Sequence, residues 1–353
     1  MLKVFHRWVE DYFAEEEAIV LLLLMALALA IILLMGNIVA PVIASMIIAY
    51  LLQGLVTKLK RFLSHNWAVT LTFSLFLGLF VLLSVLALPL IGKQLLSLTD
   101  ELPVIVVKLQ KSLMLLQEQY PQLLAQEQIN KLLSLVSQRV ASLGQVLLSF
   151  SLASIPSIIA ILIYGVLIPL MVFFFLKDKD KILQWLVRFL PNKRPLMQEI
   201  WQEMNQQVAN YARGKALEVI IVGVSTLFAF VWLDQRYAVL LAVLVGLSVI
   251  VPYIGAALVT VPVAMIGFFQ WGWSEQFAYV MVAYGIIQFL DGNVVVPLLF
   301  SEAVSLHPLA IILSVLVFGG FWGMWGVFFA IPLATLVNAL IESWPAPTNE
   351  LTS

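Results

Sequence analysis

One acidic side chain, Asp291, lies in a stretch that is apolar from Phe277 to Phe300 except for Asp291 itself and two amides, Gln288 and Asn293. On a helix these three side chains fall within about a turn and a half of one another. A carboxylate at membrane depth is costly unless it faces a bundle interior, water or a partner. We therefore expect this group to bind a polar solute or a cation, or to take up and release a proton. The structural alternative is a hydrogen-bonded cluster that joins helices, or a position near the membrane interface.

A second acid, Glu218, follows Lys215 by three residues. That spacing puts the two side chains on one helix face, where they can form an ion pair. Glu218 is thus either part of the same solute- or ion-binding site as Asp291 or half of a salt bridge at the end of a membrane span.

Two long apolar stretches, 237–271 and 308–341, are interrupted by glycine and proline. A straight helix over the first would be about 52 Å long, against a hydrocarbon core of about 30 Å. Each stretch must therefore break, tilt strongly or fold back, and such broken segments beside a buried polar group are typical of transporter binding regions. The expected hinge or gating residues are Pro252, Gly255, Gly319, Gly320, Gly323, Gly326 and Pro332. The G-x-x-x-G spacing among them is also compatible with simple close helix packing.

The acids and glycines hint at an internal repeat. Glu218 and Asp291 are 73 residues apart, and so are Gly246 and Gly319. Each acid precedes an interrupted apolar stretch, so the second half of the chain could contain two copies of one unit, inverted or parallel.

The composition places these residues in a membrane. The chain is 62% hydrophobic and 11% charged, and several uncharged runs exceed the roughly 18 residues that cross a bilayer. We expect an all-α, polytopic helical membrane protein with about eight transmembrane segments, two of them broken or re-entrant, and a small extramembrane helical insertion.

The residues that several kinds of chemistry require are absent from the sequence. The chain has no cysteine, and its three histidines, His6, His65 and His307, are scattered. There is no phosphate-binding loop and no H-E-x-x-H motif. The net charge is near zero, so no nucleic-acid partner is indicated. We expect neither an enzyme nor a bound metal or cofactor.

The pattern of apolar runs divides the chain into six regions. Residues 1–91 are an amphipathic lead and three spans, 92–150 amphipathic helices divided at Pro103 and Pro121, 151–176 a fourth span, 177–215 a basic loop with helical patterning, 216–342 the transport core, and 343–353 a tail. A tight turn at Gly36-Asn37 should separate the first two spans. The first span is expected to be retained rather than cleaved as a signal peptide.

Basic residues set the expected orientation. Of the 19 lysines and arginines, most lie in the N-terminal tail, the 58–61 loop and the 177–215 loop. By the positive-inside rule these regions, and both termini, face the cytoplasm, and residues 92–150 lie on the opposite side.

Several motifs together resemble the autoinducer-2 exporter family. They are Phe174-Phe175-Leu176-Lys177-Asp178, Val251-Pro252-Tyr253-Ile254-Gly255, Gln288 to Pro297, Leu306-His307-Pro308-Leu309, Gly319-Gly320 to Gly326, and Ala330-Ile331-Pro332-Leu333. The resemblance covers nearly the whole chain and implies about eight transmembrane segments in a homo-oligomer. Members are described as exporters of the signal autoinducer-2, and others as sodium/proton antiporters. Asp291 occupies a position where many relatives have glutamate.

These observations predict a permease or secondary transporter of a bacterial inner membrane. It would export a small polar solute such as a signalling molecule, with the lipid bilayer, the solute or a cation or proton, and further copies of itself as partners. Sodium/proton antiport is one alternative. The other is a non-transporting scaffold or regulator that binds a partner through residues 92–150.

Overall fold

The computed structural model is helical, with no strand in the ranges that it describes. Those ranges are residues 16–119, 131, 133–135, 138, 142, 155–191, 194–252, 254–300 and 307–343. The expected amphipathic lead, most of the second half of the 92–150 region and the C-terminal tail lie outside them. The expected class, an all-α polytopic membrane protein, is confirmed.

Five helical segments are long and apolar enough to cross a bilayer. They are Ile38–Leu59, His65–Glu101, Pro195–Trp232, Ile254–Trp271 and Glu275–Phe300. The shorter apolar helices are Ile19–Ile31, Ile163–Lys177, Ala238–Ser248, Leu309–Gly323 and Trp325–Ala339. Leu309–Gly323 and Trp325–Ala339 are the two arms of one broken element described below, and Ala238–Ser248 is the short arm of the other. The number of full-length spans is therefore below the expected eight.

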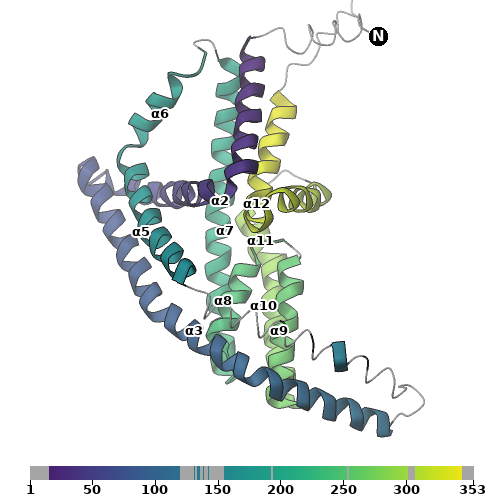
Figure 1. Ribbon diagram of the computed structural model, residues 1–353. Coiled ribbons are helices and arrows are strands. Elements are labelled where there is room, and N and C mark those ends of the chain that lie inside the picture. Colours follow the sequence, from purple (N-terminus) through teal and green to yellow (C-terminus); the bar gives the residue numbers. More distant parts are fainter. Residues whose placement is uncertain are drawn as a thin grey trace, which may run out of the picture.

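One long helix, α7 (Pro195–Trp232), lies at the centre of the molecule (Figure 1). It packs against α2 (Glu16–Leu59), α8 (Ala238–Ser248), α10 (Glu275–Leu290), α11 (Val296–Phe300) and α12 (Pro308–Ser343). The boundary expected at residue 215 falls inside α7, so the second half of the expected basic loop and the following span form one helix. The larger buried core lies between α7, α8, α9 (Ile254–Trp271) and α10, around Phe230, Leu241 and Val263.

The first helix, α2, is kinked at Met35, where the backbone leaves helical geometry (φ −127°, ψ 21°). Its two arms run in different directions in Figure 1. The break therefore falls next to the turn expected at Gly36-Asn37, but the chain bends there rather than reversing in a tight turn. Gly36 has no room for a side chain, because a Cβ would overlap the Trp322 indole.

The next helix, α3 (His65–Gln119), is continuous and has Pro89 and Pro103 in its interior. The expected division at Pro103 is wrong: a helix can retain an interior proline when neighbouring packing compensates for the lost hydrogen bond. α5 (Ile155–Lys177) packs on α2 and α3. A short helix, α6 (Lys179–Val187), leads from α5 towards α7.

Helices α8 and α9 fold back on each other as a hairpin. At its base the Gln270 side-chain N–H donates to the Asp234 carbonyl, and the Arg236 N–H donates to the Gln270 side-chain oxygen, both at 2.7 Å. The two outer ends therefore meet at one end of the molecule. With 11 residues, α8 is about 16 Å long, too short for a core of about 30 Å. Of the geometries considered for residues 237–271, the folded-back one is confirmed.

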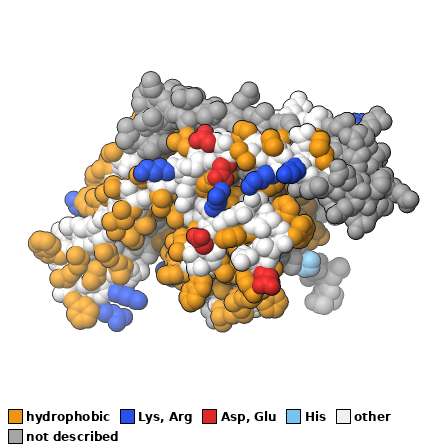
Figure 2. Space-filling view, turned by 90° about the horizontal axis from the view of Figure 1, so that it is seen from below, with side chains coloured by type: hydrophobic (Ala, Val, Ile, Leu, Met, Phe, Trp, Pro, Cys, Tyr) orange, Lys and Arg blue, Asp and Glu red, His pale blue; other side chains and the backbone are white. Residues whose placement is uncertain are grey.

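The polar C-terminal part of α3 crosses this hairpin base. Arg236 Nη1 lies 3.0 Å from Glu101 Oε1, Lys108 Nζ donates to the Phe269 carbonyl, and the Leu240 N–H donates to Gln94 Oε1. Figure 2, which views the molecule from this end, shows acidic and basic side chains near the middle of the face.

The second interrupted stretch forms α12, which breaks at Gly323. Gly323 has φ 61° and ψ −137°, a conformation that L side chains rarely adopt. The two arms run in different directions in Figure 1. They approach so closely that a Cβ on Gly326 would overlap the Phe318 carbonyl.

The two halves of this core share one order of elements. A long helix with an acid (α7, or α10 continuing into α11) precedes a broken element (α8–α9, or α12). In both broken elements a glycine after the break, Gly255 or Gly326, packs its backbone on a carbonyl before it, that of Ser248 or Phe318. This shared order agrees with the repeat expected from the spacing of Glu218 and Asp291.

Candidate functional site

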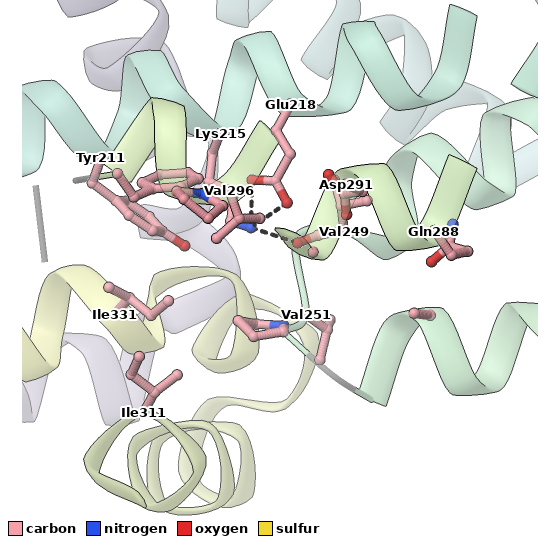
Figure 3. Close-up of a pocket in the computed structure, with 15 residues that line it drawn as sticks. Tyr211, Lys215, Glu218, Val249, Val251, Gln288, Asp291, Val296, Ile311 and Ile331 are labelled. Carbon is pink, nitrogen blue, oxygen red and sulfur yellow. Dashed lines mark hydrogen bonds and ion pairs between the residues drawn. The ribbon is translucent and has the colours of Figure 1, made fainter. Parts of the chain in front are cut away.

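A cavity of about 500 Å³ lies where α7, both broken elements and the α10–α11 segment meet (Figure 3). Among the described residues, its polar side chains come from two helical segments. Tyr211, Lys215 and Glu218 lie on one face of α7, and Gln288 and Asp291 lie where α10 ends. Val249 to Pro252 and Ile311 and Ile331 close it from the two broken elements.

Lys215 and Glu218 form a buried ion pair. Lys215 Nζ lies 3.0 Å from Oε1 and 2.8 Å from Oε2 of Glu218, and also donates to the Val249 carbonyl at 2.7 Å. The side chains are 14% and 2% exposed. The Val249 carbonyl lies at the C-terminal end of α8, where helix carbonyls lack intrahelical partners. The ammonium therefore has an acceptor for each of its three hydrogens and joins α7 to the hairpin turn.

Asp291 and Gln288 carry the unsatisfied polar atoms of the cavity. Among the described residues, neither Asp291 Oδ1 nor Gln288 Nε2 has a hydrogen-bond partner, and both atoms are buried. The residues are three apart on one helix, so an acceptor and a donor share one face. Buried polar atoms are nearly always paired, and an exception commonly marks a position for water or a ligand.

A π-helical turn, η1 (Asp291–Val295), separates α10 from α11. Asp291 is its first residue, and its carbonyl accepts the Val296 N–H. Such single turns inside α-helices occur frequently at functional sites. The extra residue changes the direction of the side chains that follow, a shift that the spacing in the sequence does not reveal.

Asn293 lies outside the cavity. It is exposed, and its side-chain N–H donates to the Phe289 carbonyl at 2.9 Å. The structure thus brings together three of the four expected binding residues, Asp291, Gln288 and Glu218, and leaves Asn293 on the outer face of the π turn.

The expected hinge residues occupy different kinds of position in the structure. Pro252 lines the cavity beside the hairpin turn, and Gly255, Gly319 and Gly326 allow close contacts that a side chain would obstruct. Gly323 is the break itself. Gly320 has open space around it, and Pro332 lies inside the second arm of α12.

Two aromatic residues of the site were not expected. The Tyr211 and Phe300 rings lie 5.7 Å apart, and Lys215 Nζ lies 5.2 Å from the centre of the Phe300 ring. The spacing of Tyr211, Lys215 and Glu218, at three and four residues, was a usable signal for the α7 side. No pattern in the sequence indicated Phe300, because its approach to α7 depends on how α11 packs.

Among the described residues that line the cavity, acidic groups outnumber basic groups. Lys215 is paired with Glu218, and Asp291 adds a further acidic group at the cavity wall. Within the described ranges, no three histidine or acidic side chains come close enough to hold a metal ion. The arrangement is suited to a solute that offers a hydrogen-bond donor or a positive charge to Asp291 and an acceptor to Gln288.

Comparison with known proteins agrees with this architecture. Residues 19–346 match the AI-2E family transporter family. The chain is 43% identical over 346 residues to "Putative permease PerM" of Escherichia coli (strain K12), covering 98% of both chains. It is 26% identical over 306 residues to "Putative transport protein YueF" of Bacillus subtilis (strain 168), covering 85% of this chain and 82% of that one. The chain therefore belongs to the AI-2E transporter family and is a multi-pass membrane protein of the transporter type.

Proposed function

We propose that this chain is a permease that exports a small polar solute, bound in the cavity formed by Lys215, Glu218, Gln288 and Asp291. Its setting would be a bacterial inner membrane, with both termini cytoplasmic as the distribution of basic residues predicts. The proposal follows the transporter family and its named permease and transport-protein relatives.

The observation that supports it best is the pair of unpartnered atoms, Asp291 Oδ1 and Gln288 Nε2, in one cavity of about 500 Å³. An orphan donor and acceptor in an apolar surround favour a ligand that supplies both missing hydrogen bonds. The buried ion pair beside them supplies a fixed local charge pattern that orients such a solute.

The parts proposed to move are the α8–α9 turn and the break at Gly323. Both contribute cavity walls, through Val251 and Pro252 on one side and Ile311 and Ile331 on the other. A shift of either element would open the cavity without unfolding α7 or α10. Broken helices around a central site move in this way in many secondary transporters.

Sodium/proton antiport is the second candidate, and the unpartnered Asp291 carboxylate is the feature that favours it. A carboxylate that is not neutralised by a protein cation can bind Na⁺ and a proton alternately. Lys215 does not fill that role fully, because its three hydrogens already have acceptors.

The test is flux in everted membrane vesicles for parent, Asp291→Asn and a matched control, Glu275→Gln. Glu275 is exposed at the start of the same helix, away from the cavity. We expect Asp291→Asn to reduce uptake of autoinducer-2, the solute that the family resemblance suggests, by about tenfold or more, since removing a charged hydrogen-bond partner costs about 1.5–3 kcal/mol. Glu275→Gln should match the parent.

A collapse of the vesicle pH gradient on adding Na⁺, abolished by Asp291→Asn, would instead establish antiport. Parent-level flux of both autoinducer-2 and Na⁺ in Asp291→Asn, at equal expression, would remove this cavity from the transport path.

A further inference from the structure

A second cavity, of about 560 Å³, lies beside the first on an adjacent face of α7, mainly between α7, the second arm of α2 and the arms of α12. Among the described residues, its lining is apolar apart from the Trp322 indole N–H, which has no hydrogen-bond partner there, and Lys215 and Tyr211, which also line the polar cavity. Lys215 Nζ is already bonded to Glu218 and to the Val249 carbonyl. The described lining of the second cavity therefore offers no free charge with which to hold a polar solute.

The hollow results from small side chains on facing helices. Ala212 and Ala216 are one turn apart on α7, and Ala44 lines the cavity from α2. All three are half-buried, and the cavity is partly open to the outside rather than a sealed void. Larger side chains at these positions would fill it.

An apolar space of this size needs an apolar occupant. Water gains too few hydrogen bonds in such a space to fill it stably, and a large void in a packed protein is costly. Two of the three bordering elements, α7 and the second arm of α2, are segments that can cross a bilayer. The surrounding medium is therefore lipid.

The volume distinguishes a lipid chain from a helix of a second copy. A helix about 10 Å wide that rises 1.5 Å per residue occupies roughly 120 Å³ per residue. The cavity of about 560 Å³ would then hold only about a turn of helix. A thin, flexible hydrocarbon chain fits a space of this kind better.

We infer that this cavity is a binding site for one acyl chain of a membrane phospholipid, whose headgroup remains at the membrane surface. The chain would pack against Ala212 and Ala216 of α7 and against Phe329 and Pro332 of α12. Because Lys215 and Tyr211 form the wall between the two cavities, the bound chain would also cover the back of the ion pair. This site is independent of the proposed transport, and its test needs no flux measurement.

The test is photo-crosslinking in proteoliposomes that contain phosphatidylcholine with a diazirine on one acyl chain, followed by peptide mapping. We expect crosslinks to concentrate on cavity-lining segments, including residues 208–219 and 328–336. Filling the hollow with Ala212→Leu and Ala216→Leu together should lower those crosslinks by about tenfold, because the larger side chains occupy the space of the acyl chain; tenfold corresponds to about 1.4 kcal/mol of binding free energy.

The matched control is Ala26→Leu with Ala28→Leu, two exposed positions on the first arm of α2. It should leave the cavity crosslinks unchanged. If the filled variant folds poorly, quenching of tryptophan fluorescence provides a second measurement, because Trp322 lines the cavity. Brominated acyl chains should therefore quench the parent more than Trp322→Phe, by the contribution of that one tryptophan.

Uniform labelling of all exposed apolar segments, with no Trp322 contribution to quenching, would overturn the proposal. So would crosslinks from these segments to a second copy of the chain, because a neighbouring protomer would then fill the cavity.

Discussion

Lys215 donates to both carboxylate oxygens of Glu218, three residues further along α7, and to the Val249 carbonyl at the end of α8. A within-helix ion pair of this spacing is usually an exposed and minor contact. Here it is buried, and its third hydrogen bond ties the central helix to the hairpin turn. The same two residues therefore form one side of the candidate site and hold its wall in place.

Removing one member of this pair should be far more damaging than removing both. Lys215→Met leaves the Glu218 carboxylate buried without a partner, which costs about 3–5 kcal/mol. Lys215→Met with Glu218→Leu leaves no uncompensated charge and should recover most of that loss. Thermal unfolding of the detergent-purified protein measures both. Equal destabilisation of the single and double variants would contradict the assigned pairing.

The exposed pair of Lys181 and Asp178 is the internal comparison. Its Nζ and Oδ1 atoms are 2.9 Å apart, but the lysine side chain is 83% exposed. The hydrogen bond from Lys181 holds the pKa of Asp178 below its usual value. Because solvent screens this pair, Lys181→Met should leave the unfolding temperature unchanged.

Gly323 should not tolerate a side chain, whereas Gly320 on the same arm should. Gly323→Ala forces a residue with a Cβ into positive φ, at a cost of about 1–3 kcal/mol. Gly320 has open space around it in an ordinary helical turn, so Gly320→Ala should be neutral or stabilising by about 0.5–1 kcal/mol. Unfolding midpoints of the two variants check this. A stable Gly323→Ala protein would mean that the break does not need this conformation.

Gly255 should be intolerant for a different reason. Its φ is not positive, but a Cβ there would overlap the Ser248 carbonyl across the hairpin turn. Gly255→Ala should therefore push α9 away from α8 and lower the yield of monodisperse protein in size-exclusion chromatography. Gly285→Ala on α10, where a Cβ meets nothing within 4 Å, is the control. Similar elution profiles for both variants would argue against the close contact.

The hairpin base depends on one glutamine. Gln270→Met removes the hydrogen bonds to the Asp234 carbonyl and the Arg236 N–H, which together should stabilise the fold by about 1–3 kcal/mol. Gln276→Met is the control, because it makes the same substitution at an exposed position in the next helix. There the glutamine side chain makes no hydrogen bond to another described residue. Hydrogen exchange of the 233–237 backbone should rise in the first variant and not in the second. Unchanged exchange in both would show that the base is held by other contacts.

Much of the architecture was predictable because polar and charged groups are costly to place in hydrocarbon, which restricts the lengths and residue types of the spans. The apolar runs, the impossibility of a straight helix over residues 237–271 and the glycines in 308–341 follow from length and composition alone. So does the expectation that an acid such as Asp291 faces inward. The prediction that Pro103 divides the helix was wrong, because proline weakens a helix but packing decides whether the helix continues.

Composition and residue spacing were sufficient to predict an all-α membrane protein with two interrupted elements and the acids beside them. The packing of the helices decided that residues 237–271 fold back as a hairpin and that Glu218 and Asp291 share one cavity. It also decided that the π turn leaves Asn293 outside. The reason is that helix periodicity specifies which side chains share a face. It does not specify which faces meet, because that depends on close contacts such as Gly255 on Ser248, made between segments that are separate in the chain.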